Sequence, residues 1–279
     1  MRREVFHTPG GIRLTARLAR GEVDIESVDG EETTVELTSL GDPERGDRQI
    51  ERSEIELRPR GDGHEVYVNA DPDDFGFRKG AFTISIAGRR APIRLTVRVP
   101  HGADVDVQTG SADVSARGRY GDVQSKTASG DIDFGEIERN AEIKVAAGDV
   151  KLGRVGGDLK LSTAAGDAIL GPVGGAATVR TASGDVVLAE AAGDVSVTSA
   201  SGDVVVRSVA RGAVELKSVS GDVVVGIRRG SRVYLDVKTV TGDARSELDV
   251  GDAPDDDEDS PLVELRATAM SGDIRIVRA

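Results

Sequence analysis

Six aspartates, each directly after a glycine, recur along the chain at intervals of 18 residues, with a final interval of 19. They are Asp131, Asp149, Asp167, Asp185, Asp203 and Asp222. If the chain coils with this period, the carboxylates form a column in which neighbours lie about 4.8 Å apart. Unit charges at that distance repel by about 1 kcal/mol in water, so the column needs a compensating interaction.

Two kinds of chemistry provide that compensation. In the first, each carboxylate accepts backbone N–H groups of its own turn, as aspartate does in Asx-turns. In the second, calcium ions bind between the coils through carboxylate oxygens. Calcium β-rolls use a G-G-x-G-x-D-x-U-x repeat, whereas here one glycine is invariant, and Ala176 and Ala213 replace the aspartate in two repeats. We therefore expect a structural column, with calcium as the weaker alternative, and no metal or cofactor site.

The remaining polar clusters offer little further chemistry. An acidic loop spans residues 249–261, and its seven carboxylates are Asp249, Asp252, Asp255, Asp256, Asp257, Glu258 and Asp259. The D-x-D-x-D-G pattern of an EF-hand is absent, so we expect a solvated charge run. The histidines His7, His64 and His101 are scattered outside the regular repeats, and no acid, base and nucleophile gather as a catalytic site requires. We expect no catalytic residues and no enzyme, with a glycan-active β-helix enzyme as the least favoured alternative.

The elements that must position the aspartates are nonapeptide repeats. Residues 147–209 form seven of them without a gap, each reading small, Gly, Asp, apolar, any, apolar, any, any, and apolar or small. Alternation at positions 4 and 6, as in Val186 and Leu188, indicates a half-buried strand. The glycine at position 2 turns the chain, because it reaches positive φ without steric cost. Each nonapeptide is therefore predicted to form one strand and one tight turn.

Two nonapeptide types alternate, so one coil takes about 18 residues. The sequence predicts an all-β fold, a single-chain β-solenoid (β-helix) with two nonapeptide half-coils per coil. No repeat can bury its apolar face alone, so neighbouring coils must stack. Leu188, Val197, Val206 and Leu216 are expected to point inward and to contact the next coil.

The repeats divide the chain at residue 101. We expect residues 1–101 to form an irregular, β-rich N-terminal cap over the open end of the solenoid, with a separate β-sandwich as the alternative. Within it, residues 21–28 match the nonapeptide, residues 41–47 are predicted to be a polar loop, and a hairpin is predicted around residues 60–63. Residues 102–279 are the predicted solenoid, and its last strand, residues 271–276, is expected to cap the structure with a polar outer side.

Position 5 of each nonapeptide repeat should face outward, because positions 4 and 6 of the same repeat face the core. In one half-coil type this position is polar. In the other it holds Ile169, Val187, Val205 and Val224. We expect these four residues to align as an interaction stripe, covered by the N-terminal region or by a second molecule. Strand propensity alone is the alternative explanation, since β-branched residues favour strands on either face.

Composition excludes several classes of partner. The net charge is −13, which argues against nucleic acid, a partner that requires basic surfaces. The chain has no cysteine, so it has no disulfide or thiolate chemistry. It has no apolar run of about 18 residues, so membrane insertion is not expected. Its N-terminus lacks the apolar run of a signal peptide, so a cytoplasmic protein is expected, with surface exposure left open.

Ser-Gly-Asp followed by Ile or Val occurs five times, and the copies begin at Ser129, Ser183, Ser201, Ser220 and Ser271. These repeats resemble the signature of a bacterial family of unknown function that is commonly labelled "putative adhesin". The resemblance covers roughly residues 12–279. It implies a β-solenoid and supplies no catalytic residues.

Taken together, these patterns favour a non-enzymatic β-solenoid scaffold or binding module that serves protein–protein interaction or self-assembly. A cell-surface adhesin or carbohydrate binder is the alternative.

Overall fold

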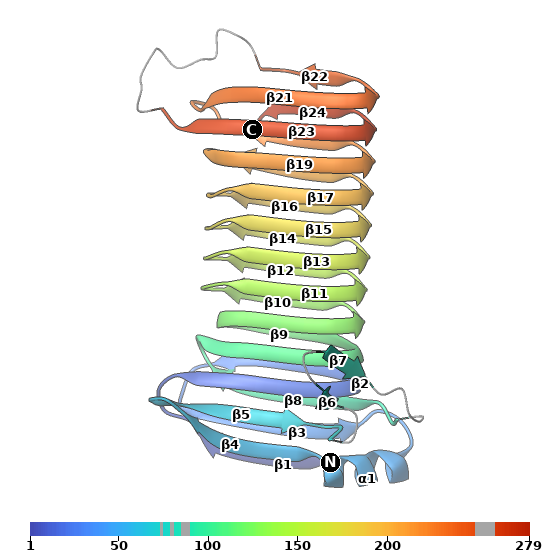
Figure 1. The fold of residues 1–279 in the computed structure, drawn as a ribbon. Helices are drawn as coiled ribbons and strands as arrows, with labels where there is room; N and C mark the ends of the chain where they lie inside the picture. The colour runs from blue at the N-terminus through green and yellow to red at the C-terminus, as the bar shows by residue number, and fades with distance from the viewer. Residues whose placement is uncertain (73–74, 79–80, 85–89, 249–259) are drawn as a thin grey trace. The chain divides into compact units, whose positions relative to one another are not determined.

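The computed structural model describes residues 1–72, 75–78, 81–84, 90–248 and 260–279. The chain is an all-β protein whose coils form a β-solenoid, as predicted. It divides into two compact units. The first consists of Met1–Arg139 with Ile143–Gly148, and the second of Asn140–Glu142 with Asp149–Ala279 (Figure 1).

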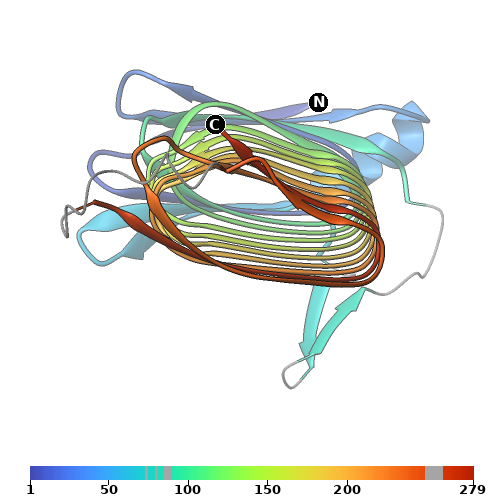
Figure 2. The same ribbon diagram turned by 90° about the horizontal axis from the view of Figure 1, so that it is seen from above.

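The second unit is the regular one, and its strands are short. They are β12 (Val150–Val155), β13 (Leu159–Ala165), β14 (Ala168–Val173), β15 (Ala177–Ser183), β16 (Val186–Ala191), β17 (Val195–Ser201), β18 (Val204–Val209), β19 (Gly212–Ser220), β20 (Val223–Ile227), β21 (Arg232–Thr241), β22 (Ala244–Ser246), β23 (Leu262–Ser271) and β24 (Ile274–Arg278). Alternate strands pair in parallel, so β14, β16 and β18 form one face and β13, β15 and β17 the other. Seen from above, successive coils of this unit lie over one another (Figure 2).

The core of the second unit follows the predicted alternation. Leu188, Val197, Val206 and Leu216 are all buried. Leu188 is the register partner of Val206, and Val197 is the partner of Leu216. The prediction that these side chains point inward against the next coil is therefore confirmed.

The end of the second unit differs from the prediction. The last strands, β23 and β24, do not cap the unit, because β23 pairs with β19 on one side and with β21 on the other. In the same way, β24 pairs with both β20 and β22. The final segment of the chain is thus inserted between two coils that precede it in sequence (Figure 1). The terminal coil is β21–β22, and the expectation that residues 271–276 form the cap was wrong.

The first unit contains longer and more irregular elements. They are β1 (Arg2–His7), β2 (Ile12–Val28), β3 (Glu32–Ser39), α1 (Pro43–Arg52), β4 (Glu54–Arg60), β5 (Gly63–Asn69), β6 (Phe75–Arg78), β7 (Ala81–Ile84), β8 (Ile93–Pro100), β9 (Ala103–Ser129) and β10 (Ile132–Ile137); β11 (Ala141–Ala147) begins in the second unit and ends in the first. β2 pairs in parallel with β8 and β9 over its second half, where the nonapeptide match was noted. β1, β3 and β8 pair in antiparallel fashion, as do β4 and β5. The predicted hairpin around residues 60–63 is confirmed, and the role of residues 1–101 as a cap stays a prediction.

Helix α1 replaces the polar loop that was predicted at residues 41–47. Asp42 caps it, because the Asp42 carboxylate accepts a hydrogen bond from the Glu44 N–H at 3.0 Å, and Pro43 occupies the first turn. Gly46 of α1 packs against the end of β3, where an added Cβ would meet the Ser39 hydroxyl. The loop prediction was wrong because an aspartate, a proline and a glutamate in this order also begin helices.

Among the described residues, Tyr120 and Phe134 are the largest fully buried side chains, and both belong to the first unit. Their rings meet edge to face at 6.0 Å between centroids. The Tyr120 hydroxyl lies within hydrogen-bond distance of the backbone carbonyl oxygens of Arg117 (2.7 Å) and Ile25 (3.0 Å), which share its single proton. Burial raises the pKa of the Tyr120 phenol, so this side chain is a neutral structural anchor.

Candidate functional site

The aspartate column is a hydrogen-bonded ladder between coils. The Asp167 Oδ1 atom accepts the backbone N–H of Asp185 at 2.8 Å, and the Asp185 Oδ1 atom accepts that of Asp203 at 2.8 Å. The ladder continues through Asp222 and reaches Asp273 and Asp243. In the first unit, Asp131 donates its N–H to Asp113 in the same way at 2.9 Å. The carboxylates therefore bind N–H groups one coil away, and the expectation that they bind their own turns was wrong.

The turn glycine explains why each carboxylate binds an N–H group of the adjacent coil. Gly202 has φ +115°, and an added Cβ would lie 2.3 Å from the carbonyl oxygen of Gly184 in the preceding coil. This close approach of the backbones puts each Asp N–H next to the carboxylate of the previous coil. Each carboxylate thus takes up a backbone donor, which offsets part of the repulsion between neighbouring charges.

A second ladder runs through the other turn type and is interrupted. Asn140 accepts the N–H of Asp158, and Asp158 accepts that of Ala176, both at 2.9 Å. Asp194 then accepts the N–H of Ala213 at 2.8 Å. Ala176 and Ala213 donate a backbone N–H but have no side-chain acceptor, so each alanine interrupts the ladder, which restarts at Asp194 after Ala176. Asparagine serves as well as aspartate at Asn140, so the bond requires an oxygen acceptor and no charge.

The metal alternative has no structural counterpart in the described part of the chain. Among those residues, no group of three or more His, Cys, Asp or Glu is arranged to hold a metal ion. The acidic carboxylates of residues 249–259 lie outside the described residues. The described helix is also too short and polar to cross a lipid bilayer.

The four residues of the predicted interaction stripe are brought into line. Register pairs join Ile169 to Val187, Val187 to Val205, and Val205 to Val224. Lys151 and Arg275 follow at the two ends of this line. Ile169 is 56% exposed, and the three valines are half-buried. The stripe is thus continuous along the face but presents little apolar area beyond Ile169.

Larger exposed apolar side chains gather at a corner of the last coils, which we call the corner patch: Val219, Met270 and Val240. They are 50%, 58% and 77% exposed. Each precedes one of the register partners Ser220, Ser271 and Thr241, so the three occupy the same corner of successive coils. Earlier coils have alanine at this corner, as at Ala182 and Ala200. Sequence reasoning missed this patch because β23 is inserted out of sequence order.

The terminal strand β21 is a free edge. Within the described residues it pairs only with β23, and the inward-facing Val233, Leu235 and Val237 are only partly covered. Leu235 is 37% exposed, whereas its register partner Leu265 on β23 is fully buried. Such an edge presents unpaired backbone donors and acceptors next to apolar side chains.

The first unit brings together a Ser–His–Asp group that the scattered sequence positions did not reveal. The Ser27 hydroxyl lies 2.8 Å from Nδ1 of His101, and Nε2 of His101 lies 3.4 Å from the Asp29 carboxylate. However, Ser27 is only 7% exposed, and its hydroxyl accepts the backbone N–H of Arg119 at 2.7 Å. A nucleophile must be open to substrate and face separate oxyanion donors. The geometry therefore fits a strand-bracing role, in which Ser27 holds the irregular backbone at Arg119.

Comparison with known proteins places this architecture in a family. The family model described as Toastrack DUF4097 matches residues 18–277. Comparison with curated proteins gave no match.

Three solved structures align with the chain along nearly its whole length. A "putative cell adhesion protein" from Clostridium sporogenes ATCC 15579 is 10% identical, with 100% of this chain and 99% of that chain covered and a TM-score of 0.27. A "putative adhesin" from Bacteroides fragilis NCTC 9343 is 11% identical, with 99% and 96% covered and a TM-score of 0.44. A "putative adhesin" from Parabacteroides distasonis ATCC 8503 is 11% identical, with 99% and 96% covered and a TM-score of 0.39. The match of the family model over residues 18–277 identifies the chain as a member of the Toastrack DUF4097 family.

Proposed function

We propose that the chain is a non-enzymatic β-solenoid binding module that self-associates through β21, the free edge strand of its second unit. The observation that carries this proposal is the unpaired edge of β21 with its half-covered apolar side chains. Adding a strand to such an edge pairs the free backbone groups and covers the apolar residues. The corner patch, which includes Val240 of the same strand, adds exposed apolar area beside the edge.

The hydrogen bonds of β21 indicate which backbone groups are free. The Arg232 N–H donates to the Pro261 carbonyl at 2.8 Å, so this residue faces β23. In a regular parallel ladder every second residue repeats that direction. The N–H and C=O groups of Val233, Leu235 and Val237 then point to the unpaired side.

Charge favours a second copy of the chain in one antiparallel register. Asp236 and Lys238 lie two residues apart on the outward face of β21. When two copies meet about a twofold axis at Val237, each Asp236 lies opposite a Lys238. An axis at Asp236 would oppose two aspartates, and an axis at Leu235 would oppose Arg232 and Lys238. Like charges directly opposite each other are destabilising, so the register with the axis at Val237 is preferred. A twofold interface of this kind is closed, so association stops at a dimer.

Sedimentation velocity tests the proposal with two lysine variants. Leu235→Lys places a charge on the free edge and should shift the parent from dimer to monomer, because inward-pointing charges block edge pairing. Ile169→Lys adds the same charge to the interaction stripe and should leave the dimer intact. A parent that stays monomeric at high protein concentration contradicts self-association. A dimer lost in Ile169→Lys but retained in Leu235→Lys assigns the interface to the stripe instead.

The non-enzymatic part of the proposal has its own test at Ser27. A fluorophosphonate probe labels activated serine nucleophiles, and we expect no labelling because the Ser27 hydroxyl is buried and already accepts an N–H. Labelling of the parent that disappears in Ser27→Ala would overturn this part. Unfolding of the two proteins by urea would show separately whether Ser27 braces the strand.

A further inference from the structure

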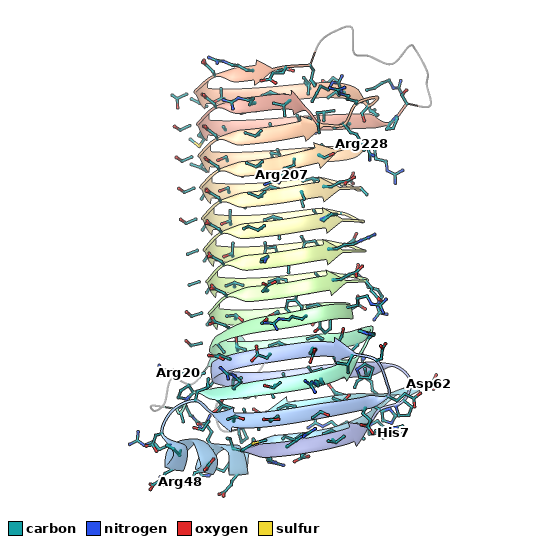
Figure 3. The ribbon with its side chains drawn as sticks, turned by 180° about the vertical axis from the view of Figure 1, so that it is seen from behind. His7, Arg20, Arg48, Asp62, Arg207 and Arg228 are labelled. Carbon is teal, nitrogen blue, oxygen red and sulfur yellow. The ribbon has the colours of Figure 1, made fainter. Side chains whose placement is uncertain are left out.

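Three arginines of α1 share one side of the helix. Arg45, Arg48 and Arg52 are spaced i, i+3 and i+7, a spacing that aligns side chains along a helix. Arg48 is labelled on α1 in Figure 3. Arg90, which precedes β8 in sequence, faces the same space. This concentration of positive charge is unusual in a chain whose net charge is −13.

These four arginines line a cavity of about 430 Å³ in the first unit. The other lining residues are Gln49 and a few small apolar residues, and no carboxylate is among the described residues that line it. The volume falls in the range of small-molecule sites. No aromatic side chain is among the lining residues, so the cavity has no described surface on which a base or sugar ring would stack.

The wall of the cavity is held by a buried polar network. The Gln49 amide donates to Oδ1 of Asp71 at 2.5 Å and accepts the Ala91 N–H at 3.2 Å. Asp71 is fully buried, and its Oδ2 atom accepts the Ala19 N–H at 2.7 Å. Arg90 lies 3.7 Å from the same carboxylate. The network fixes α1 against the strands, so the arginines project from a rigid support.

Nearby carboxylates balance the arginines only in part. Asp42 lies 3.5 Å from Arg45, Glu44 lies 4.0 Å from Arg48, and both carboxylates are largely exposed. Such surface pairs are weak and screened by salt. The guanidinium groups of Arg45 and Arg48 each carry five N–H donors, more than these two ion pairs use. Arg52 makes no ion pair with any described residue.

We infer that this cavity binds a compact polyvalent oxyanion, one that carries phosphate or several carboxylates. The planar fork of arginine matches both groups in bidentate geometry, and converging guanidinium groups select multiply charged ligands. The inference is independent of the proposed self-association, because it concerns the first unit alone.

Calorimetric titration with pyrophosphate and with citrate, at equal ionic strength, tests the inference and distinguishes the two sources of charge. We expect one saturable site per chain for at least one anion, with affinity that falls as salt rises. Arg48→Gln with Arg52→Gln should weaken binding by at least about tenfold, since charge-assisted bonds are lost. Arg207→Gln with Arg228→Gln removes the same charge from exposed positions of the second unit (Figure 3) and should leave binding unchanged.

Arg48→Lys with Arg52→Lys provides a conservative variant that keeps the charge and loses the fork. It should bind with intermediate affinity, and its melting curve shows whether α1 is still folded. The inference is overturned if neither anion gives saturable heat, or if the glutamine variant binds like the parent. Equal weakening in the Arg207 and Arg228 control would also overturn it, because binding would then reflect net charge alone.

Discussion

Strands β23 and β21 are neighbours with closely similar apolar patterns, yet their side chains have different environments. Val263, Leu265 and Ala267 of β23 are fully buried, because coils cover the strand on both sides. Their register partners on β21 have a coil on one side only among the described residues, and they stay partly exposed. In a solenoid, burial is therefore set by the number of stacked neighbours as well as by the pattern of the strand itself. The same reasoning locates the place where a further strand would be added.

The largest expected effect compares aspartate at matched positions. Leu265→Asp buries an uncompensated charge between two coils and should cost about 3 kcal/mol or more of unfolding free energy. Leu235→Asp, at the register partner on the edge, should cost less than about 1 kcal/mol in the monomer. Urea unfolding of both variants measures the difference. Equal costs would contradict the distinction between covered and uncovered strands.

Two turn glycines allow the same comparison for the backbone, because one lies against an adjacent coil and the other does not. Gly202→Ala meets both an unfavourable positive φ and the Gly184 carbonyl, and should cost about 3 kcal/mol or more. Gly30→Ala has a similar φ of +120° but no neighbouring atom within 4 Å, so it should cost only about 1–2 kcal/mol. Thermal unfolding of the two variants separates the cost of contact with the adjacent coil from the cost of the positive φ. A Gly30 variant as unstable as the Gly202 variant would show that φ alone matters.

Substitutions in the aspartate ladder should change the unfolding free energy less than the glycine substitutions do. Asp185→Ala leaves the Asp203 N–H without its acceptor and should cost about 1 kcal/mol. Asp185→Asn should be neutral or stabilising, because asparagine keeps the acceptor, as at Asn140, and removes a repulsive charge. Asp243→Ala, in the terminal coil, should have almost no effect, since no described backbone N–H bonds to its carboxylate and its ion pair with Arg245 is exposed. Calcium and EDTA should both leave the parent Tm unchanged, and a rise in Tm with calcium would favour the metal alternative.

Ser199 gives the smallest expected change, and it is a gain. Its hydroxyl is buried and has no hydrogen-bond partner among the residues that the structure describes. On β23 the same column holds Ala269, the register partner of Ser218. Ser199→Ala should therefore raise the unfolding free energy by up to about 1 kcal/mol. A loss of stability would indicate that the hydroxyl binds an internal water.

The regular part of this fold was predictable because one short pattern repeats. The alternation of Val186 and Leu188 fixes which side chains are buried, and the 18-residue period fixes which residues become register partners. The ladder partner of Asp185 was not predictable, because it depends on how closely the backbones of adjacent coils approach. The insertion of β23 between β19 and β21 was not predictable either, since nothing local orders the coils after Ile227.

The candidate sites were less accessible to sequence reasoning. The alignment of Ile169 with Val187 follows from the period alone. The arginine cluster of α1 was missed because residues 41–47, where the helix begins, were interpreted as a loop, although Asp42 and Pro43 are a helix-start signal. Ser27 and His101 are 74 residues apart, and only the pairing of β2 with β8 and β9 brings them together.

The most direct test of the account is cross-linking of single cysteines on β21, which is clean because the chain has no native cysteine. In the twofold register, the two Val237 residues lie opposite each other, whereas the two Val233 residues lie about 26 Å apart along the strands. A short bis-maleimide should therefore link Val237→Cys into a covalent dimer and leave Val233→Cys monomeric. Equal cross-linking of the two variants, or none in Val237→Cys, would contradict association through this edge.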